Sequence, residues 1–130
     1  MLATQFDSMM FSPRTDTMLP FDVLEALDRL GGDEALFGEI ARSVVDSMPE
    51  LEGALRGALG QGDHRQVRAA AHALKGALLA ISAEPSATLA TRIEDAARGG
   101  DAFTGLALYP ELHRELGRVV SAMARYASAY

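Results

Sequence analysis

The sequence predicts an all-α protein: an antiparallel four-helix bundle with a short additional helix at its N-terminal side. Three observations support this fold class. No segment alternates apolar and polar residues with the period of two that marks a strand. Ala, Leu, Glu and Arg, which favour helices, dominate from about residue 21 onward. Four segments repeat apolar residues at helical spacing, and since their connections are short, their apolar faces are best buried against one another in one domain.

The chain begins with a segment of a different character. Residues 1–19 contain Ser, Thr, Met and Phe without a helical period, and we expect an N-terminal tail that is ordered in part at most. The bundle domain follows at 20–130. Its short additional helix is expected over Phe21–Leu30, and Gly31 and Gly32 end it, because glycine readily adopts the left-handed conformation found at helix C-termini.

The second helix is expected at about 33–60, as one long, bent helix that Asp33 caps. Its apolar residues fall within a sector about 100° wide when they are placed at the helical period. They are Phe37, Ile40, Val44, Met48, Leu51, Leu55 and Leu59. The sector continues across Pro49, which falls on the solvent-facing side, where a kink bends a helix around its core. Gly60 and Gly62 end this helix.

The third helix begins after Asp63 and runs to about Ala80. Asp63 and Gln66, three residues apart, resemble a capping box, in which the first side chain accepts a hydrogen bond from the backbone of the first turn.

The fourth helix is expected to have Ser82, Glu84 and Pro85 in its first turn. Proline loses no hydrogen bond there, and an acidic side chain favours the positive end of the helix dipole. Gly99 and Gly100 end the helix.

The last helix is expected to have Pro110 in its first turn, while residues 101–109 are ambiguous. Its apolar stripe consists of Leu112, Leu116, Val119, Val120, Met123 and Ala127.

Composition limits the class of function. The formal net charge of -6 disfavours nucleic acid, whose binding needs a surplus of Lys and Arg on one face. The absence of cysteine removes disulfides, thiolate metal sites and cysteine nucleophiles. The N-terminus lacks the pattern of a secretory signal, and no segment approaches the roughly 20 apolar residues of a membrane span. We therefore expect a cytoplasmic protein without a membrane contact.

His72 departs from the apolar pattern of the third helix. Val67, Ala70, Ala71, Leu74, Leu78 and Ile81 define the core direction of that helix. His72 points about 150° away from it and is expected to face solvent, although a histidine in an apolar helix is otherwise often a packed core residue. The residues that share its face are Arg65, Arg68, Lys75, Gly76 and Leu79.

Gly76 is expected to destabilise the third helix, because glycine inside a helix costs about 1 kcal/mol relative to alanine. Its lack of a side chain would let another protein's active-site loop approach His72. Arg65, Arg68 and Lys75 are either a solvated helix face or a set of cations that offsets the charge of a phosphoryl group. The exposed Leu79 is either a lone surface residue or part of an apolar docking patch.

The segment His72-Ala73-Leu74-Lys75-Gly76 matches the H-x-L-K-G signature of histidine-containing phosphotransfer (Hpt) domains, and the chain resembles that family from about residue 22 onward. Other matching segments are Leu30-Gly31-Gly32-Asp33, Gly62-Asp63, Ile81-Ser82-Ala83, Ile93-Glu94 and Arg98-Gly99-Gly100-Asp101. Departures are Ala77 in place of a frequent serine, Ser82 in place of a helix-breaking glycine, and Pro85-Ser86 in place of an apolar helix start. They leave the shape of the turn between the third and fourth helices open.

The resemblance implies that His72 is phosphorylated, at Nε2, while Lys75 steadies the phosphoryl group and Gly76 opens the approach. It implies reversible phosphoryl transfer with the aspartyl phosphate of response-regulator receiver domains, fed by a hybrid histidine kinase. In this family the Mg²⁺ belongs to the receiver, so no cofactor or metal is expected in this chain. Without a nucleotide-binding motif the chain is not expected to act as a kinase. The resemblance and the self-complementary stripes favour a monomer.

Three other interpretations stay open on the residues alone. His64, His72 and His113 lack the spacing of a metal site in a bundle, which makes a metalloprotein the weakest of them. A dimerising histidine-kinase hairpin also exposes a phosphorylated histidine, but an acid and a proline normally follow that residue. A non-catalytic bundle that docks receivers without transferring phosphate is the third, against which the joint presence of His72, Lys75 and Gly76 argues.

Overall fold

The computed structural model describes residues 20–129. These residues form five helices and confirm the all-α fold class. The helices are α2 (Val23–Arg29), α3 (Glu34–Gln61), α4 (His64–Ala80), α5 (Glu84–Arg98) and α6 (Ala102–Ala129). The tail expected at 1–19 lies outside the described residues.

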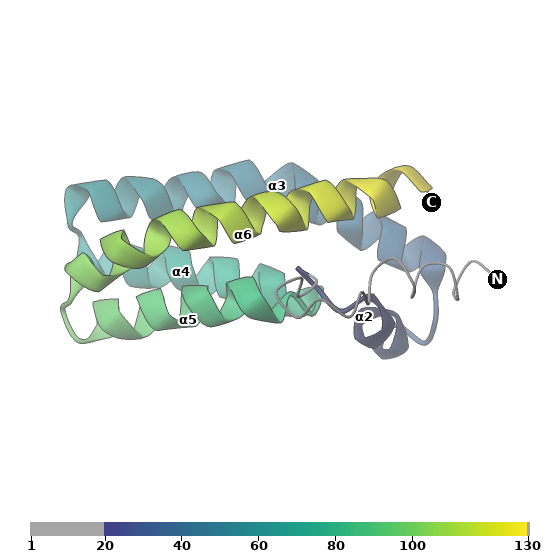
Figure 1. The fold of residues 1–130 in the computed structure, drawn as a ribbon, viewed down its shortest axis with the longest axis horizontal. Coiled ribbons are helices and arrows are strands. Elements are labelled where there is room, and N and C mark those ends of the chain that lie inside the picture. Colours follow the sequence, from purple (N-terminus) through teal and green to yellow (C-terminus); the bar gives the residue numbers. More distant parts are fainter. Residues whose placement is uncertain (1–19, 130) are drawn as a thin grey trace.

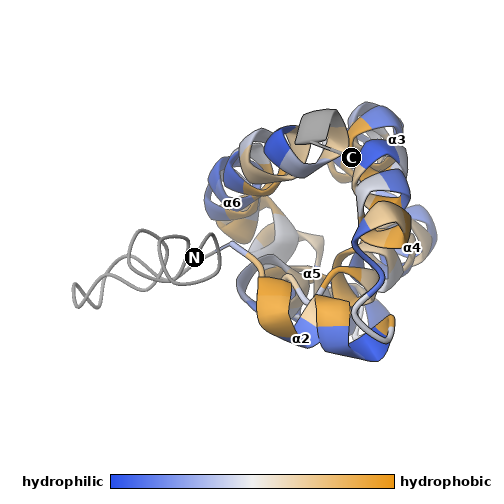
Figure 2. Cartoon of the chain, turned by 90° about the vertical axis from the view of Figure 1, so that its right-hand side faces the viewer, coloured by the Kyte–Doolittle hydropathy of each residue, from blue (hydrophilic) through white to orange (hydrophobic). Residues whose placement is uncertain are grey.

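Helices α3 to α6 form the predicted antiparallel four-helix bundle (Figure 1). Each of them packs against the two that adjoin it in the order α3, α4, α5, α6 and back to α3. Seen along the bundle, the four helices surround a common centre, and α2 lies at the end where α3 begins (Figure 2). One side of the bundle is therefore formed by α4 with α5, and another is formed by α3 with α6.

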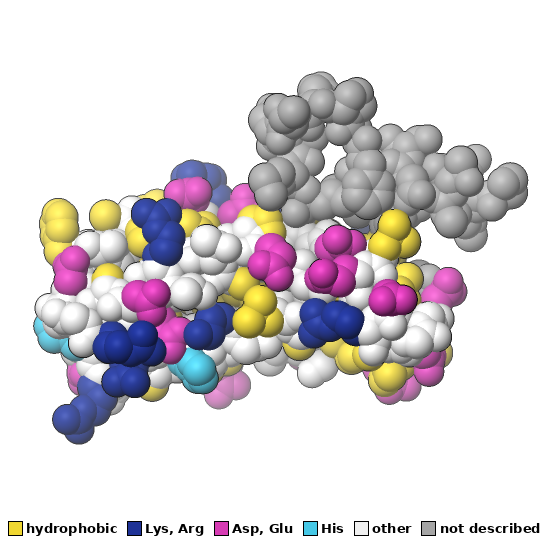
Figure 3. All heavy atoms as spheres, turned by 90° about the horizontal axis from the view of Figure 1, so that it is seen from below, with side chains coloured by type: hydrophobic (Ala, Val, Ile, Leu, Met, Phe, Trp, Pro, Cys, Tyr) yellow, Lys and Arg dark blue, Asp and Glu magenta, His cyan; other side chains and the backbone are white. Residues whose placement is uncertain are grey.

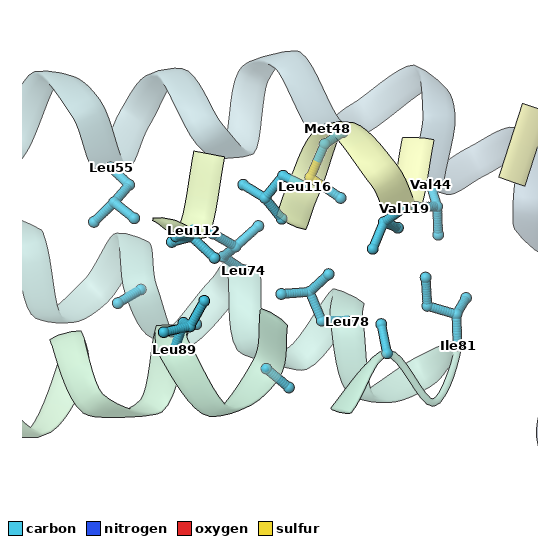
Figure 4. Close-up of a cluster of buried hydrophobic side chains, with 14 of the residues drawn as sticks. Val44, Met48, Leu55, Leu74, Leu78, Ile81, Leu89, Leu112, Leu116 and Val119 are labelled. Atoms are coloured by element: carbon cyan, nitrogen blue, oxygen red, sulfur yellow. The ribbon is translucent and has the colours of Figure 1, made fainter. Parts of the chain in front are cut away.

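The core lies between the four helices, where the apolar stripes meet. Leu55, Leu74, Leu112 and Leu116 are completely buried and face one another across the bundle (Figure 4). Full burial of each such side chain contributes about 1.5–3 kcal/mol relative to exposure, so this layer is a large part of the stability of the fold. An aromatic cluster of Phe21, Phe37 and Tyr126, with ring centroids 5.3 to 6.3 Å apart, ties the segment before α2 to α3 and α6.

Helix boundaries follow the capping signals of the sequence. Asp33 and Asp63 accept hydrogen bonds from the backbone N–H three residues onward, at 3.0 and 3.1 Å, and so cap α3 and α4. Gly62 ends α3 in the left-handed conformation, with φ of 68°. As predicted, α3 continues through Pro49, which is exposed, so that the missing N–H lies on the outer side of the helix.

The start of α6 differs from the sequence prediction. We expected Pro110 in the first turn, but α6 begins at Ala102 and Pro110 lies inside it, so that prediction is wrong. The helix starts earlier because Asp101 accepts a hydrogen bond from Thr104 N at 3.1 Å, which supplies a cap. Gly105 also packs in the core against α3 and α5. Pro110 is exposed, where water can satisfy the carbonyl that loses its partner.

The turn between α4 and α5 keeps a left-handed residue although the family's glycine is absent. Ser82 has a φ of 57° and is buried. Its Oγ accepts a hydrogen bond from Arg29 Nη1 at 3.0 Å, and its carbonyl accepts one from Asp22 N at 3.0 Å. Helix α5 begins at Glu84, so the placement of Ser82 in its first turn was wrong. Contacts with α2 offset the strain of a non-glycine residue in this conformation.

Candidate functional site

His72 lies on α4 with its ring exposed, as the helical pattern predicted. The side chain is 69% exposed, whereas Leu74 and Ala71 on the other side of the helix are fully buried. The ring Nδ1 lies 2.9 Å from Glu94 Oε2 on α5. The histidine is thus exposed but held at one nitrogen.

Glu94 is the buried centre of this site. Its side chain is only 3% exposed, and three cationic or ionisable groups surround the carboxylate. Lys75 Nζ lies 2.7 Å from Oε1 in an ion pair, His72 lies on Oε2, and Arg98 Nη2 lies 3.5 Å from Oε2. Burial raises the pKa of the Glu94 carboxyl, but Lys75 and then His72 lower it more, and the net pKa is below its ordinary value. Glu94 is therefore ionised near neutral pH.

The ionised carboxylate decides which ring nitrogen carries the hydrogen. A carboxylate only accepts hydrogen bonds, so Nδ1 of His72 must donate to Glu94. In the neutral ring the lone pair then lies on Nε2, on the far side of the ring from Glu94. The contact with Glu94 therefore presents a nucleophilic nitrogen to solvent in a fixed orientation.

A shallow basic pocket adjoins the ring. It measures about 380 Å³ and is lined by Arg65, Arg68, Ala69, His72, Glu94 and Arg98. Figure 3, which looks onto the side of the bundle below α5 in Figure 1, shows Lys and Arg side chains gathered beside histidine in the left half of the molecule. Three guanidinium groups suit a phosphoryl group, because they can offset its charge of nearly two and donate hydrogen bonds to its oxygens.

Only some of the site residues predicted from the sequence line the pocket beside His72. Arg65 and Arg68 line the pocket with His72, whereas Lys75 does not line it and is paired with Glu94 behind the ring. Gly76 is exposed, and a Cβ built on it meets no atom within 4 Å, so nothing in the described residues requires a glycine there. Leu79 is exposed at 38% and lies outside the pocket lining.

Sequence reasoning missed the roles of Glu94 and Arg98, which it used only as marks of family resemblance. A signal was present, since Glu94 directly follows Ile93 in the inward stripe of α5, which also contains Leu89 and Ala97. A carboxylate in an apolar stripe is costly unless it is paired, so a cation or histidine had to face it from another helix. Arg98 follows Glu94 by one turn and reaches the same carboxylate.

Among residues 20–129 no group of three or more His, Cys, Asp or Glu side chains is arranged to hold a metal ion. None of the helices in this range combines the length and the apolar character needed to cross a membrane.

Comparison with known proteins places this geometry in a family. The Hpt domain family matches the chain over residues 39–124. The structure of histidine-containing phosphotransfer protein B (HptB) from Pseudomonas aeruginosa PAO1 is similar with a TM-score of 0.79 and 23% sequence identity, over 87% of this chain and 98% of that chain. The HPT domain from the Hpt sensor hybrid histidine kinase from Shewanella is similar with a TM-score of 0.76 and 26% identity, over 85% of this chain and 96% of that chain.

No curated protein sequence matches the chain. The family match spans more than half of the sequence and includes the exposed histidine, the buried glutamate and the basic pocket between them. The chain therefore belongs to the Hpt domain family, whose members transfer phosphoryl groups through histidine in phosphorelays.

Proposed function

We propose that the chain is a phosphorelay intermediate that accepts a phosphoryl group on His72 from the aspartyl phosphate of a receiver domain and passes it reversibly to another. One observation carries this proposal. The exposed ring of His72 is held through Nδ1 by the buried Glu94 at 2.9 Å, so that Nε2 faces outward beside Arg65, Arg68 and Arg98.

The transfer step follows from this arrangement. The lone pair of Nε2 attacks phosphorus, the bond from phosphorus to the aspartyl oxygen breaks, and the carboxylate leaves with the electron pair. The ring gains positive charge as the new bond forms, and the negative Glu94 at Nδ1 stabilises it. The arginines offset the charge of the bound phosphoryl group without a covalent contact, which keeps the reverse reaction accessible.

Lys75 acts on the glutamate in this proposal. An unpaired carboxylate next to the incoming phosphoryl group would repel it, and burial would favour protonation of that carboxylate. Lys75 lies 2.7 Å from Glu94 and is itself only 24% exposed, so it neutralises the carboxylate from the inner side. The phosphoryl group is then steadied chiefly by the arginines, and Lys75 keeps Glu94 ionised.

In this proposal the receiver supplies Mg²⁺ and the pocket that aligns the aspartyl phosphate in line with Nε2. Phosphate enters the relay from a hybrid histidine kinase. The monomeric state and the cytoplasmic location expected from the sequence remain predictions.

The test uses phosphorylated receiver domains and maps acid-labile phosphate on the chain after proteolysis. We expect the phosphate on the peptide that contains His72, and its complete loss in His72→Gln. His64→Gln is the matched control, because His64 is an exposed histidine at the start of the same helix and its replacement should leave transfer unchanged.

Two results would contradict the proposal. Receiver-derived phosphate that persists in His72→Gln at the wild-type rate would place the acceptor elsewhere. Binding of receivers to the wild-type chain without any labelling, across a panel of receivers, would instead identify a non-catalytic docking module.

A further inference from the structure

A second histidine, on the other side of the bundle, is held in the same way as His72. His113 lies on α6 with its side chain 62% exposed, and its Nδ1 contacts Glu52 Oε2 on α3. The side chain of Glu52 is 13% exposed. This pair bridges α3 and α6, whereas His72 and Glu94 bridge α4 and α5 (Figure 1).

Tyr109 fixes the carboxylate of Glu52. Its hydroxyl donates a hydrogen bond to Glu52 Oε2 at 2.6 Å, and its ring centroid lies 5.9 Å from that of His113. Burial raises the pKa of Tyr109, and Glu52 raises it further, so the phenol keeps its proton and remains a donor. Tyr109, one turn before His113 on α6, therefore holds the Glu52 carboxylate by a hydrogen bond, as Lys75 on α4 holds the Glu94 carboxylate by an ion pair.

The same reasoning on hydrogen positions applies here. The Glu52 carboxylate is a hydrogen-bond acceptor, so the His113 nitrogen that contacts it carries the hydrogen. The lone pair of the neutral ring then lies on Nε2, which points away from Glu52.

His113 and His72 also share the spacing to a glycine. Gly117 follows His113 by one turn, as Gly76 follows His72, and among the described residues no atom lies within 4 Å of a Cβ built on it. Gly117 also lines a shallow groove of about 540 Å³ whose basic residues are Arg114, Arg118 and Arg125, but His113 does not line that groove, whereas His72 lines its own pocket. Arg118 is also paired with Glu115, at 2.9 Å.

His64 shows that exposure alone does not produce this arrangement. It is exposed on α4, but no hydrogen bond or ion pair holds its ring among residues 20–129. The Asp101 carboxylate interacts with His64 by charge, but no hydrogen bond from a described residue fixes the hydrogen on one ring nitrogen. The chain thus contains two oriented exposed histidines and one exposed histidine without such a partner.

We propose that His113 Nε2 is a second phosphoryl acceptor, oriented by Glu52 and served by acyl phosphates. The lone pair of Nε2 forms the bond to phosphorus, the bond from phosphorus to the acyl oxygen breaks, and the carboxylate leaves with the electron pair. The Nδ1 proton stays on the ring, where Glu52 offsets the positive charge. Gly117, one helix turn from the ring, leaves room for the donor to approach.

The test compares the three histidines within one sample. The full chain is incubated separately with acetyl phosphate and with phosphoramidate, and phosphate is quantified on the peptides that contain His64, His72 and His113. We expect His113 to be labelled at least about tenfold faster than His64 with both donors, since an oriented, charge-assisted hydrogen bond contributes about that factor. His113→Gln removes this label and leaves the label on His72.

Variants of Glu52 test the orienting role. Glu52→Ala should slow labelling of His113 by at least about tenfold, and Glu52→Gln, whose amide oxygen can still accept from Nδ1, should restore part of the rate. The rate at His72 and the far-ultraviolet circular dichroism show in the same samples whether the bundle is intact.

The outcomes separate this inference from the function proposed for His72. Labelling of His113 no faster than His64, or unchanged labelling in a folded Glu52→Ala, overturns it. Labelling by phosphoramidate alone overturns the choice of acyl phosphates as donors. A labelled His113 with an unlabelled His72 would support this inference, and the function proposed for His72 is tested separately with phosphorylated receivers, because the receiver supplies the Mg²⁺ and the aligning pocket for that transfer.

Discussion

The replacement of Gly76 by glutamine should make the protein more stable and its phosphoryl transfer slower. Gly76 lies inside α4 in an exposed position where an added Cβ meets no atom within 4 Å. Glutamine therefore gains helix propensity without a steric penalty, and we expect the free energy of unfolding to rise by about 0.5 kcal/mol. The side chain would project one turn from His72, into the path of a receiver, and displacement of the reacting atoms by about 1 Å can slow transfer by roughly a hundredfold.

Gly57→Gln is the matched control for this experiment. Gly57 is also an exposed glycine inside a helix with no atom within 4 Å of an added Cβ, but it lies on α3, outside the pocket beside His72. Urea denaturation should show a similar gain in stability for both variants, while rapid-quench transfer from a phosphorylated receiver should be slow only in Gly76→Gln. Full transfer activity in Gly76→Gln would refute the argument that this glycine allows a close approach.

Three further predictions concern stability. Gly105→Ala should lower the free energy of unfolding by about 1–3 kcal/mol in urea denaturation, because a Cβ there would lie 2.7 and 3.3 Å from two core side chains. An unchanged free energy of unfolding would show that these side chains move aside without cost. Ser82→Ala should cost about 1 kcal/mol in the same assay, because Arg29 loses the hydroxyl that it contacts while the left-handed backbone remains; an unchanged midpoint would argue against that contact. The pKa of Glu94 is lower in the folded chain than in the unfolded chain, so the unfolded chain binds more protons on acidification. The stability that Glu94 contributes is therefore present above the ordinary pKa of 4.5 and is lost as the pH falls below it. Glu94→Gln should therefore flatten the acid limb of a stability profile, and an acid limb as steep as that of the wild type would contradict the assignment.

Much of the fold followed from local pattern because the local signals agree with one another. The stripe from Phe37 to Leu59 keeps its phase across Pro49, and α3 is indeed one helix. Asp33 and Asp63 cap the helices that they precede. Pro110 misled the prediction, because a proline is compatible both with a first turn and with an exposed position inside a helix. The cap at Asp101 and the burial of Gly105 decide between these two, and the second depends on contacts with other helices.

By itself, the sequence determined that His72 faces solvent, since that depends only on the angle between the histidine and the apolar stripe of its own helix. It also identified Arg65 and Arg68, which share that helix face. Only the tertiary structure decided that Glu94 of α5 holds His72, that Lys75 pairs with Glu94, and that Glu52 of α3 holds His113. These contacts join residues of different helices, and the rotation and height of one helix against another are set by packing of the whole core, which no single helical pattern contains.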